Sequence, residues 1–201
     1  MTTQSPRIDG RAARAERTRE AVVDAMLSLT DEGHLRPTAR QISARAGVSL
    51  RSVFQHFDDL ETLFAAAADR QVERLTHLAV VIPPDAPFEQ RLSAFVETRG
   101  ALLETISPVR RSALLGEPFS PEIARRLRWS RDMNREEAER VFGVELAAIP
   151  EDRRHVVGFA LHAATEWYTW EMLRAHDNLS ITDAIKVMSL TIRALLNKEA
   201  R

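Results

Sequence analysis

Apolar residues recur at intervals of three and four along almost the whole chain, and no segment shows the strict alternation of a half-buried strand. The first such face belongs to a helix over about residues 14 to 30 and is formed by Val22, Val23, Met26, Leu27 and Leu29. The segment "DEGHLRP" then ends this helix, because Gly33 can adopt positive φ and Pro37 cannot continue a helix. The pattern predicts an all-α protein.

Signals for two short helices follow directly. Thr38 and Gln41 have the spacing of a capping box, which predicts a helix over about residues 39 to 45. Gly47 supplies the left-handed residue at which this helix stops, and Ser49 caps the next one. Two short helices joined by a glycine turn form a helix-turn-helix, whose second helix can enter the major groove of DNA. A plain corner between two helices inside a helical domain is the alternative.

The rest of the chain is also predicted to be helical. Asp58 and Glu61 form a further capping box, and a helix is expected from there to about residue 79. Prolines and the turn "HDNLS" separate five more expected helices, near 87–105, 108–115, 121–147, 151–176 and 181–198. We therefore expect a head of three helices at the N-terminus, followed by a larger helical body.

Charge is distributed unevenly between these two parts. Residues 1–57 hold nine arginines and six carboxylates, whereas the whole chain has a net charge of −1. A basic end on an acidic body indicates that only the first part meets a polyanion. Arg7, Arg11 and Arg14 are expected in an N-terminal arm that reaches the DNA backbone or a minor groove, or in a solvated tail.

Several classes of protein are disfavoured by composition. Cysteine is absent, so the chain has no disulfide, thiolate metal site or cysteine nucleophile. Apolar runs are too short to span a bilayer, and the first ten residues lack the apolar core of a secretion signal, so we expect a cytoplasmic protein.

Enzyme motifs are missing as well, including a glycine-rich phosphate loop, the H-E-x-x-H pair and a nucleophile elbow. His155, His162 and Glu166 are spaced by seven and four residues, so they form either a metal site or, more simply, a polar patch. We expect no enzyme, no cofactor and no bound metal.

The segment "TARQISARAGVSLRSVFQHFDDLETLF", residues 38–64, resembles the signature of the tetracycline-repressor (TetR) family of transcriptional regulators. The matching positions are Ile42, Ala46, Gly47, Val48, Ser49, Phe54, His56, Phe57, Glu61 and Leu63. Phe54 departs from the tyrosine, and Leu60 from the lysine, that are common there, so two phosphate contacts of the family are missing. The resemblance covers residues 14–64 well and the remainder only in its helical layout.

This resemblance implies a DNA-binding domain over residues 1–60 and an effector-binding and dimerisation domain over residues 61–201. It also implies a homodimeric repressor that a small molecule releases from a palindromic operator. An activator, or a regulator without a ligand, is the alternative. The segment "TEWYTWEMLRAHDNLSITDAI" resembles the C-terminal part of the family, which implies that the helices near 151–176 and 181–198 pair with their copies in a second subunit. A core within one subunit is the other interpretation.

Chemistry suggests roles in the second helix of the motif. Arg51 suits a bidentate contact to guanine, Gln55 suits adenine, and Leu50 suits a thymine methyl group. Hydroxyl and imidazole groups can set the register on phosphates, although Thr38 and Ser49 also serve as caps and His56 can instead pack against the next helix. The expected DNA-binding residues are Thr38, Arg40, Ser49, Leu50, Arg51, Ser52, Phe54, Gln55 and His56.

The body contains many aromatic and flexible apolar residues beside a few polar ones. Most must belong to the core, yet an apolar cavity with a few convergent polar groups is the usual form of a small-molecule site. We expect an internal pocket between the helices near 87–105, 121–147 and 151–176, into which Asn134 also points. Its lining residues are expected to be Phe95, Arg99, Trp129, Met133, Phe159, His162, Glu166, Trp167 and Trp170.

Overall fold

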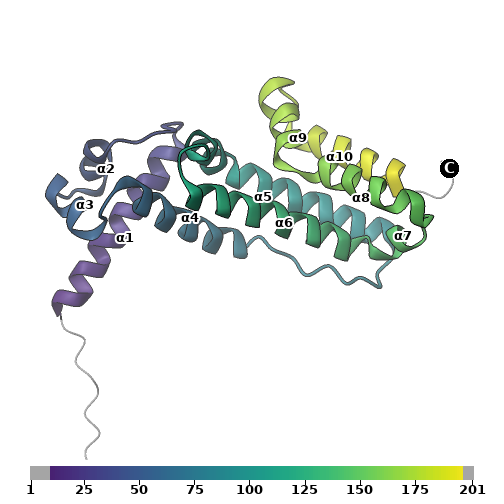
Figure 1. Ribbon diagram of the computed structural model, residues 1–201, viewed down its shortest axis with the longest axis horizontal. Helices are drawn as coiled ribbons and strands as arrows, with labels where there is room; N and C mark the ends of the chain where they lie inside the picture. The colour runs from purple at the N-terminus through teal and green to yellow at the C-terminus, as the bar shows by residue number, and fades with distance from the viewer. Residues whose placement is uncertain (1–9, 197–201) are drawn as a thin grey trace, which may run out of the picture. The chain divides into compact units, whose positions relative to one another are not determined.

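The structure is a computed structural model that describes residues 10–196, and within this range every regular element is a helix (Figure 1), which confirms the all-α prediction. The elements are α1 (Gly10–Asp31), α2 (Ala39–Ala46), α3 (Leu50–His56), α4 (Leu60–Thr76), α5 (Phe88–Gly116), α6 (Pro121–Val141), α7 (Gly143–Ala147), α8 (Glu151–Thr165), α9 (Trp167–Glu171), the π-helix η1 (Met172–His176) and α10 (Ile181–Leu196). No helix within residues 10–196 combines the length and the apolar composition that crossing a membrane requires.

The chain divides into two compact units. The head unit comprises Met1–Glu73 and Pro108–Ser120, and the body unit comprises Arg74–Ser107 and Pro121–Arg201. Helix α5 therefore contributes its last turns to the head unit and its earlier turns to the body unit. The expected division into a DNA-binding domain over residues 1–60 and an effector-binding and dimerisation domain over residues 61–201 concerns function, and it stays a prediction.

The caps predicted for the head are present. The Thr38 hydroxyl accepts from the backbone N–H of Gln41 at 3.3 Å, and the Gln41 side chain accepts from the N–H of Thr38 at 2.9 Å. Gly47 ends α2 in the left-handed conformation, with φ 67° and ψ 29°. Ser49 caps α3 by accepting from the N–H of Ser52 at 3.1 Å. These local bonds produce the expected helix-turn-helix.

The cap of α4 differs from the expected one. Asp59, not Asp58, precedes the first helical residue, and its carboxylate accepts from the N–H of Thr62 at 2.7 Å. Glu61 therefore does not close a capping box, and its carboxylate accepts from the Ser120 hydroxyl within the head unit. The helix ends at Thr76, three residues before the expected end.

Helix α5 runs without interruption through Pro108, so the expected separate helices over 87–105 and 108–115 are wrong. An internal proline costs about 3 kcal/mol because it removes a hydrogen bond and its ring crowds the preceding turn. Burial on both sides offsets this cost, since Leu103 before Pro108 and Val109 and Ala113 after it are all buried.

Two of the long helices predicted for the body are divided. Phe142 separates α6 from α7, and its buried ring lies edge-on to Phe95 with 5.1 Å between centroids. Glu166 separates α8 from α9, because its backbone is extended with φ −82° and ψ 156°. Helix α10 begins at Ile181 after a turn in which Asn178 has φ 54°, and its expected end at 198 lies outside the described residues.

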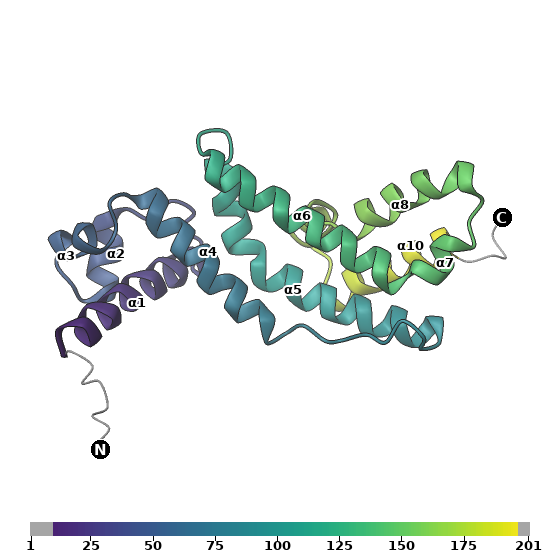
Figure 2. The same ribbon diagram turned by 60° about the horizontal axis from the view of Figure 1, so that its bottom comes forward.

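The body unit is a bundle in which α6 runs alongside the first part of α5, as both views show (Figures 1 and 2). Helix α8 packs against α6, α7 and α10. The most deeply buried large side chains of the body unit include Phe95, Phe142, Leu161, Trp170 and Ile192.

Candidate nucleic-acid interface

Four side chains of α3 face solvent on one side of the helix. Leu50 is 44% exposed and Phe54 is 49% exposed, and Arg51 and Gln55 are exposed as well. At 3.6 residues per turn these four positions lie within an arc of about 140°. Val53 lies outside this arc and is buried, and Ser52 and His56, also outside it, are half-buried. We call the four exposed residues the reading face.

Polar groups surround the reading face. Thr38 and Ser49, at the starts of α2 and α3, are exposed, and each hydroxyl already accepts from the backbone of its own helix. Arg40 is exposed on the first turn of α2. Most of the expected DNA-binding residues are therefore exposed, but Ser52 and His56 are half-buried, and the contact of any of them with DNA stays a prediction.

Side-chain bonds fix the orientation of α2 on α1. Arg45 of α2 donates two hydrogen bonds of 2.6 Å to the Glu32 carboxylate and one of 2.6 Å to the Ser28 hydroxyl. The Arg45 hydrogen bond lowers the pKa of Glu32 below its ordinary range. Because both partners are exposed, this ion pair contributes little to the free energy of unfolding, and its main effect is to orient α2 on α1.

The other neighbours of α1 in the head unit are also bonded to it. Phe57 directly follows α3, and the centroid of its ring lies 5.0 Å from the Arg19 guanidinium of α1. Arg70 of α4 donates to Asp24 of α1 at 3.3 Å. These contacts hold the residues that follow α3 in place, so the reading face has a defined position within the head unit.

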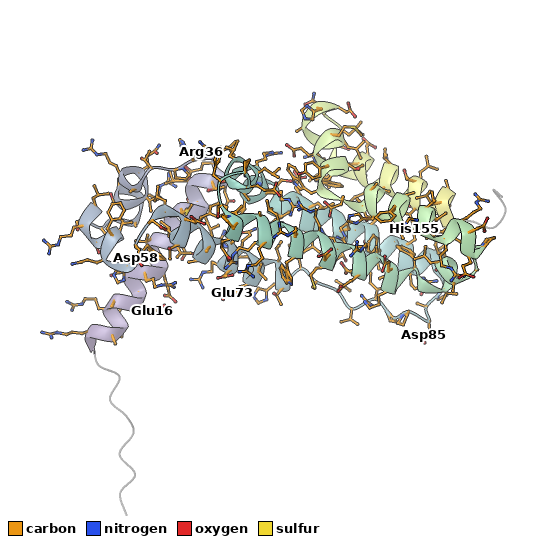
Figure 3. The ribbon with its side chains drawn as sticks, in the orientation of Figure 1. Glu16, Arg36, Asp58, Glu73, Asp85 and His155 are labelled. Atoms are coloured by element: carbon orange, nitrogen blue, oxygen red, sulfur yellow. The ribbon has the colours of Figure 1, made fainter. Side chains whose placement is uncertain are left out.

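Helix α1 begins at Gly10, four residues before the predicted start. Arg11 and Arg14, expected in or near an N-terminal arm or in a solvated tail, therefore lie on the first turns of this helix, and Arg7 lies outside the described residues. Figure 3 shows nitrogen-tipped side chains that point to solvent around Glu16 on these turns. The arginines at positions 11 and 14 are thus carried on a helix and not on an arm.

The body residues expected to line one pocket fall into two groups. Trp129, Met133 and Phe159 are about half exposed, so they lie at the surface of the body unit. Phe159 borders an open groove of about 760 Å³ between α6, α7 and α8. The remaining members are buried, apart from the half-buried His162, and they are Phe95, Arg99, Glu166, Trp167 and Trp170.

Three polar side chains expected to share one space do meet. Arg99 donates to the backbone carbonyl of Asn134 at 3.2 Å, and the side-chain amide of Asn134 donates to Glu166 at 3.2 Å. Arg99 also donates to Glu137 at 2.8 Å, and its guanidinium lies 5.0 Å from the centroid of the Phe95 ring. Burial lowers the pKa of Arg99, and the nearby Glu137 and Glu166 carboxylates oppose that change. We call Arg99, Asn134, Glu137 and Glu166 the buried polar cluster.

Glu137 was not among the pocket residues predicted from the sequence. Its position one turn after Asn134 on α6 was the available signal. Two buried nitrogens of the expected pocket residues, Arg99 Nε in the cluster and His162 Nδ1 outside it, have no hydrogen-bond partner. These two atoms therefore have hydrogen-bonding capacity that the described part of the protein does not use.

His155, His162 and Glu166 do not form a metal site. Glu166 leaves the helical path and accepts from the N–H of Trp167 at 3.2 Å, so it no longer shares a face with the two histidines. The His155 ring packs edge-on against Phe159 with 4.9 Å between centroids. Within residues 10–196, no three histidine or carboxylate side chains gather closely enough to hold a metal ion.

Helices α8 and α10 contact each other, and both carry exposed apolar side chains. Leu190 of α10 is 66% exposed. The exposed residues recur at helical spacing on each helix, and they are Val156, Phe159 and Ala163 on α8 and Val187, Leu190 and Ala194 on α10. We call these six residues the apolar face.

Comparison with models of protein families finds no match, and no curated protein matches the chain. Solved structures do match. A TetR-like transcriptional regulator from Rhodococcus sp. RHA1 is 21% identical, with 97% of this chain and 100% of that chain covered and a TM-score of 0.58. A TetR-family regulator from Marinobacter aquaeolei VT8 is 16% identical, with 89% and 88% covered and a TM-score of 0.67. A third, from Pseudomonas syringae pv. tomato str. DC3000, is 22% identical, with 90% and 95% covered and a TM-score of 0.61. The chain therefore has the fold of TetR-family transcriptional regulators.

Proposed function

We propose that this protein is a transcriptional regulator of the TetR type that binds double-stranded operator DNA with α3. The reading face is the observation that carries this proposal. Its four side chains are exposed on one side of a helix whose other side is packed, in the arrangement that a major groove accepts. The fold shared with TetR-family regulators supports the same assignment.

Each group at this surface has a role in the proposal. Arg51 donates two hydrogen bonds to O6 and N7 of a guanine, and Gln55 pairs with the N6 and N7 edge of an adenine. The polar residues around them bind phosphate oxygens and set the register. They are Thr38, Arg40, Ser49, Ser52 and His56.

The protein acts as a homodimer in this proposal, and the apolar face is the contact surface. Water-exposed side chains such as Leu190 and Val156 lose contact with water when a second copy covers them. Because a two-fold dimer presents two copies of α3 in opposite directions, its operator has two inverted half-sites.

The effector in this proposal is a small molecule that binds beside the buried polar cluster. Trp167 directly follows Glu166 in the sequence, and it and Trp170 are buried, so in this proposal their rings form the apolar part of the site. Arg99 Nε and His162 Nδ1 offer unused polar atoms to such a molecule. A compound that binds the DNA-incompetent conformation more tightly would release the operator, so the protein would act as a repressor.

Selection of tight binders from a random double-stranded DNA library with the full-length protein tests the central part of the proposal. Arg51→Ala should weaken binding to the enriched sequence by about 1–3 kcal/mol and binding to random DNA much less. The matched control is Arg128→Ala, which removes an equal charge from an exposed position on α6. Equal losses on selected and random DNA would mean that Arg51 contacts only phosphate, and the assignment of α3 as the base-reading helix would fail.

A further inference from the structure

The reading face of α3 consists of two parallel rows, each with members four residues apart. Arg51 and Gln55 form a polar row, and Leu50 and Phe54 form an apolar row beside it. Side chains at this spacing are neighbours on a helix surface. The two rows therefore face a ligand together, and any contact with one row brings the other close.

The apolar row lies outside the buried core of the head unit and is about half exposed. Val53 supplies the buried contact of α3, whereas Leu50 and Phe54 are 44% and 49% exposed. Two large apolar side chains left in water on a seven-residue helix reduce solubility without helping the fold. Their exposure is explained if a binding partner covers both side chains and removes them from water.

Phe54 limits the kind of partner. Its ring has no hydroxyl, so it donates no hydrogen bond to a phosphate oxygen. The apolar group that the major groove presents is the C5-methyl of thymine. Four residues span about 6 Å along a helix, and base pairs are about 3.4 Å apart, so Leu50 and Phe54 can reach methyl groups up to two base steps apart.

We propose that Leu50 and Phe54 read C5-methyl groups of pyrimidines that lie next to the purines contacted by Arg51 and Gln55. The inference rests on the proposed DNA-binding function and deepens it, because it assigns a chemical pattern to the half-site. Each half-site then contains thymines, or methylated cytosines, beside the guanine and adenine that the polar row reads.

Replacement of thymine by uracil in the selected operator tests this inference, because it removes only the methyl group. Binding of the full-length protein is measured to operators with single thymine-to-uracil changes at each position of both strands. At the contacted positions the wild type should lose about fourfold in affinity per methyl, which corresponds to about 0.8 kcal/mol. Leu50→Ala should remove the loss at one position, and Phe54→Ala should remove it at another.

Control variants separate the possible outcomes. Phe119→Ala removes an exposed ring in the head unit outside α3 and should leave every affinity unchanged. Phe54→Tyr adds a hydroxyl, and it should weaken binding to the selected operator if the ring faces a methyl group. Tighter binding of this variant to selected and random DNA alike would place the ring at a phosphate and overturn the inference.

Two failures are distinguishable in this experiment. An enriched operator whose thymines all tolerate uracil would overturn the inference and leave the proposed function intact. A selection that enriches no sequence at all would overturn both. Because Leu50 and Phe54 are not part of the buried core, their alanine variants should unfold near the wild-type thermal midpoint, which circular dichroism checks.

Discussion

Replacing Gly47 by alanine is expected to destabilise the head by a predictable amount. Gly47 has φ 67°, a left-handed conformation that costs an L-residue roughly 1–2 kcal/mol. An added Cβ would meet no heavy atom within 4 Å, so no steric clash adds to this cost. Alanine also restricts the unfolded chain, which returns about 0.4–1 kcal/mol. The net loss in free energy of unfolding is therefore expected to be about 1 kcal/mol.

Gly143→Ala provides the matched control for this measurement. Gly143 begins α7, has no positive φ, and has equally open space around its Cβ position. Alanine at this position should be neutral or slightly stabilising, because alanine is the better helix former. Chemical denaturation of both variants, followed by far-ultraviolet circular dichroism, gives the two free energies.

The turn itself should survive the Gly47→Ala change. The N–H of Gly47 donates to the Ala44 carbonyl at 3.3 Å, and the N–H of Val48 donates to the Ser43 carbonyl at 3.0 Å. Both bonds remain possible with alanine, so the folded variant should bind selected DNA with the wild-type affinity. Equal free energies for the two alanine variants would refute the conformational explanation, and a loss above about 3 kcal/mol would point to a clash instead.

Three further predictions address the dimer, the head and the effector. Leu190→Arg places an unpaired charge in the proposed dimer contact, so sedimentation of this variant should show monomers. The control Val81→Arg changes an 88% exposed position outside the apolar face and should remain dimeric. Because the pKa of Glu32 is lowered in the folded protein, its carboxylate gives the head a small stabilisation at neutral pH, which is lost as the pH falls below 4.5. The small difference in melting temperature between wild type and Glu32→Gln should therefore shrink over the same range, and a difference that stays constant with pH would contradict this prediction. A small molecule that binds with measurable affinity and quenches tryptophan fluorescence should also release the selected DNA, and Arg99→Met should abolish both effects. Quenching without release of DNA would refute the proposed coupling between effector binding and DNA binding.

Local interactions explain which parts of the fold were predictable. The caps at Thr38 and Ser49 involve bonds between residues three apart, so the sequence alone contains both partners. Asp58 and Asp59 are chemically equivalent neighbours, however, and the choice between them depends on where the backbone of α4 begins. Such an ambiguity of one residue cannot be resolved from residue types.

Long-range packing explains the errors in the body. A proline ends a helix by local rules, but the burial of Val109 and Ala113 continues α5 through Pro108. At the break between α8 and α9, the Glu166 side chain accepts a hydrogen bond from Asn134, which is 32 residues away in the sequence. Neither effect leaves a signal in the local periodicity.

The candidate sites follow the same division. The buried Val53 and the exposed Arg51 and Gln55 follow from the helical period, so they were predictable, whereas His56, expected on the outward face, is half-buried. The expected pocket residues lie on helices whose orientation in the bundle the sequence does not specify. Trp129 and Met133 were therefore expected inside but lie at the surface, while Arg99 and Glu166 do lie inside.

The contact between Arg51 and a guanine edge is the centre of the proposed function, and a double-mutant cycle measures it directly. One change is Arg51→Ala, and the other replaces the guanine in the selected half-site by 7-deazaguanine, which lacks the N7 acceptor. We predict that each single change weakens binding and that the double change costs less than their sum, with a coupling of at least about 0.5 kcal/mol. Losses that add within about 0.5 kcal/mol at every guanine of the operator would contradict the assignment of α3 as the helix that reads bases.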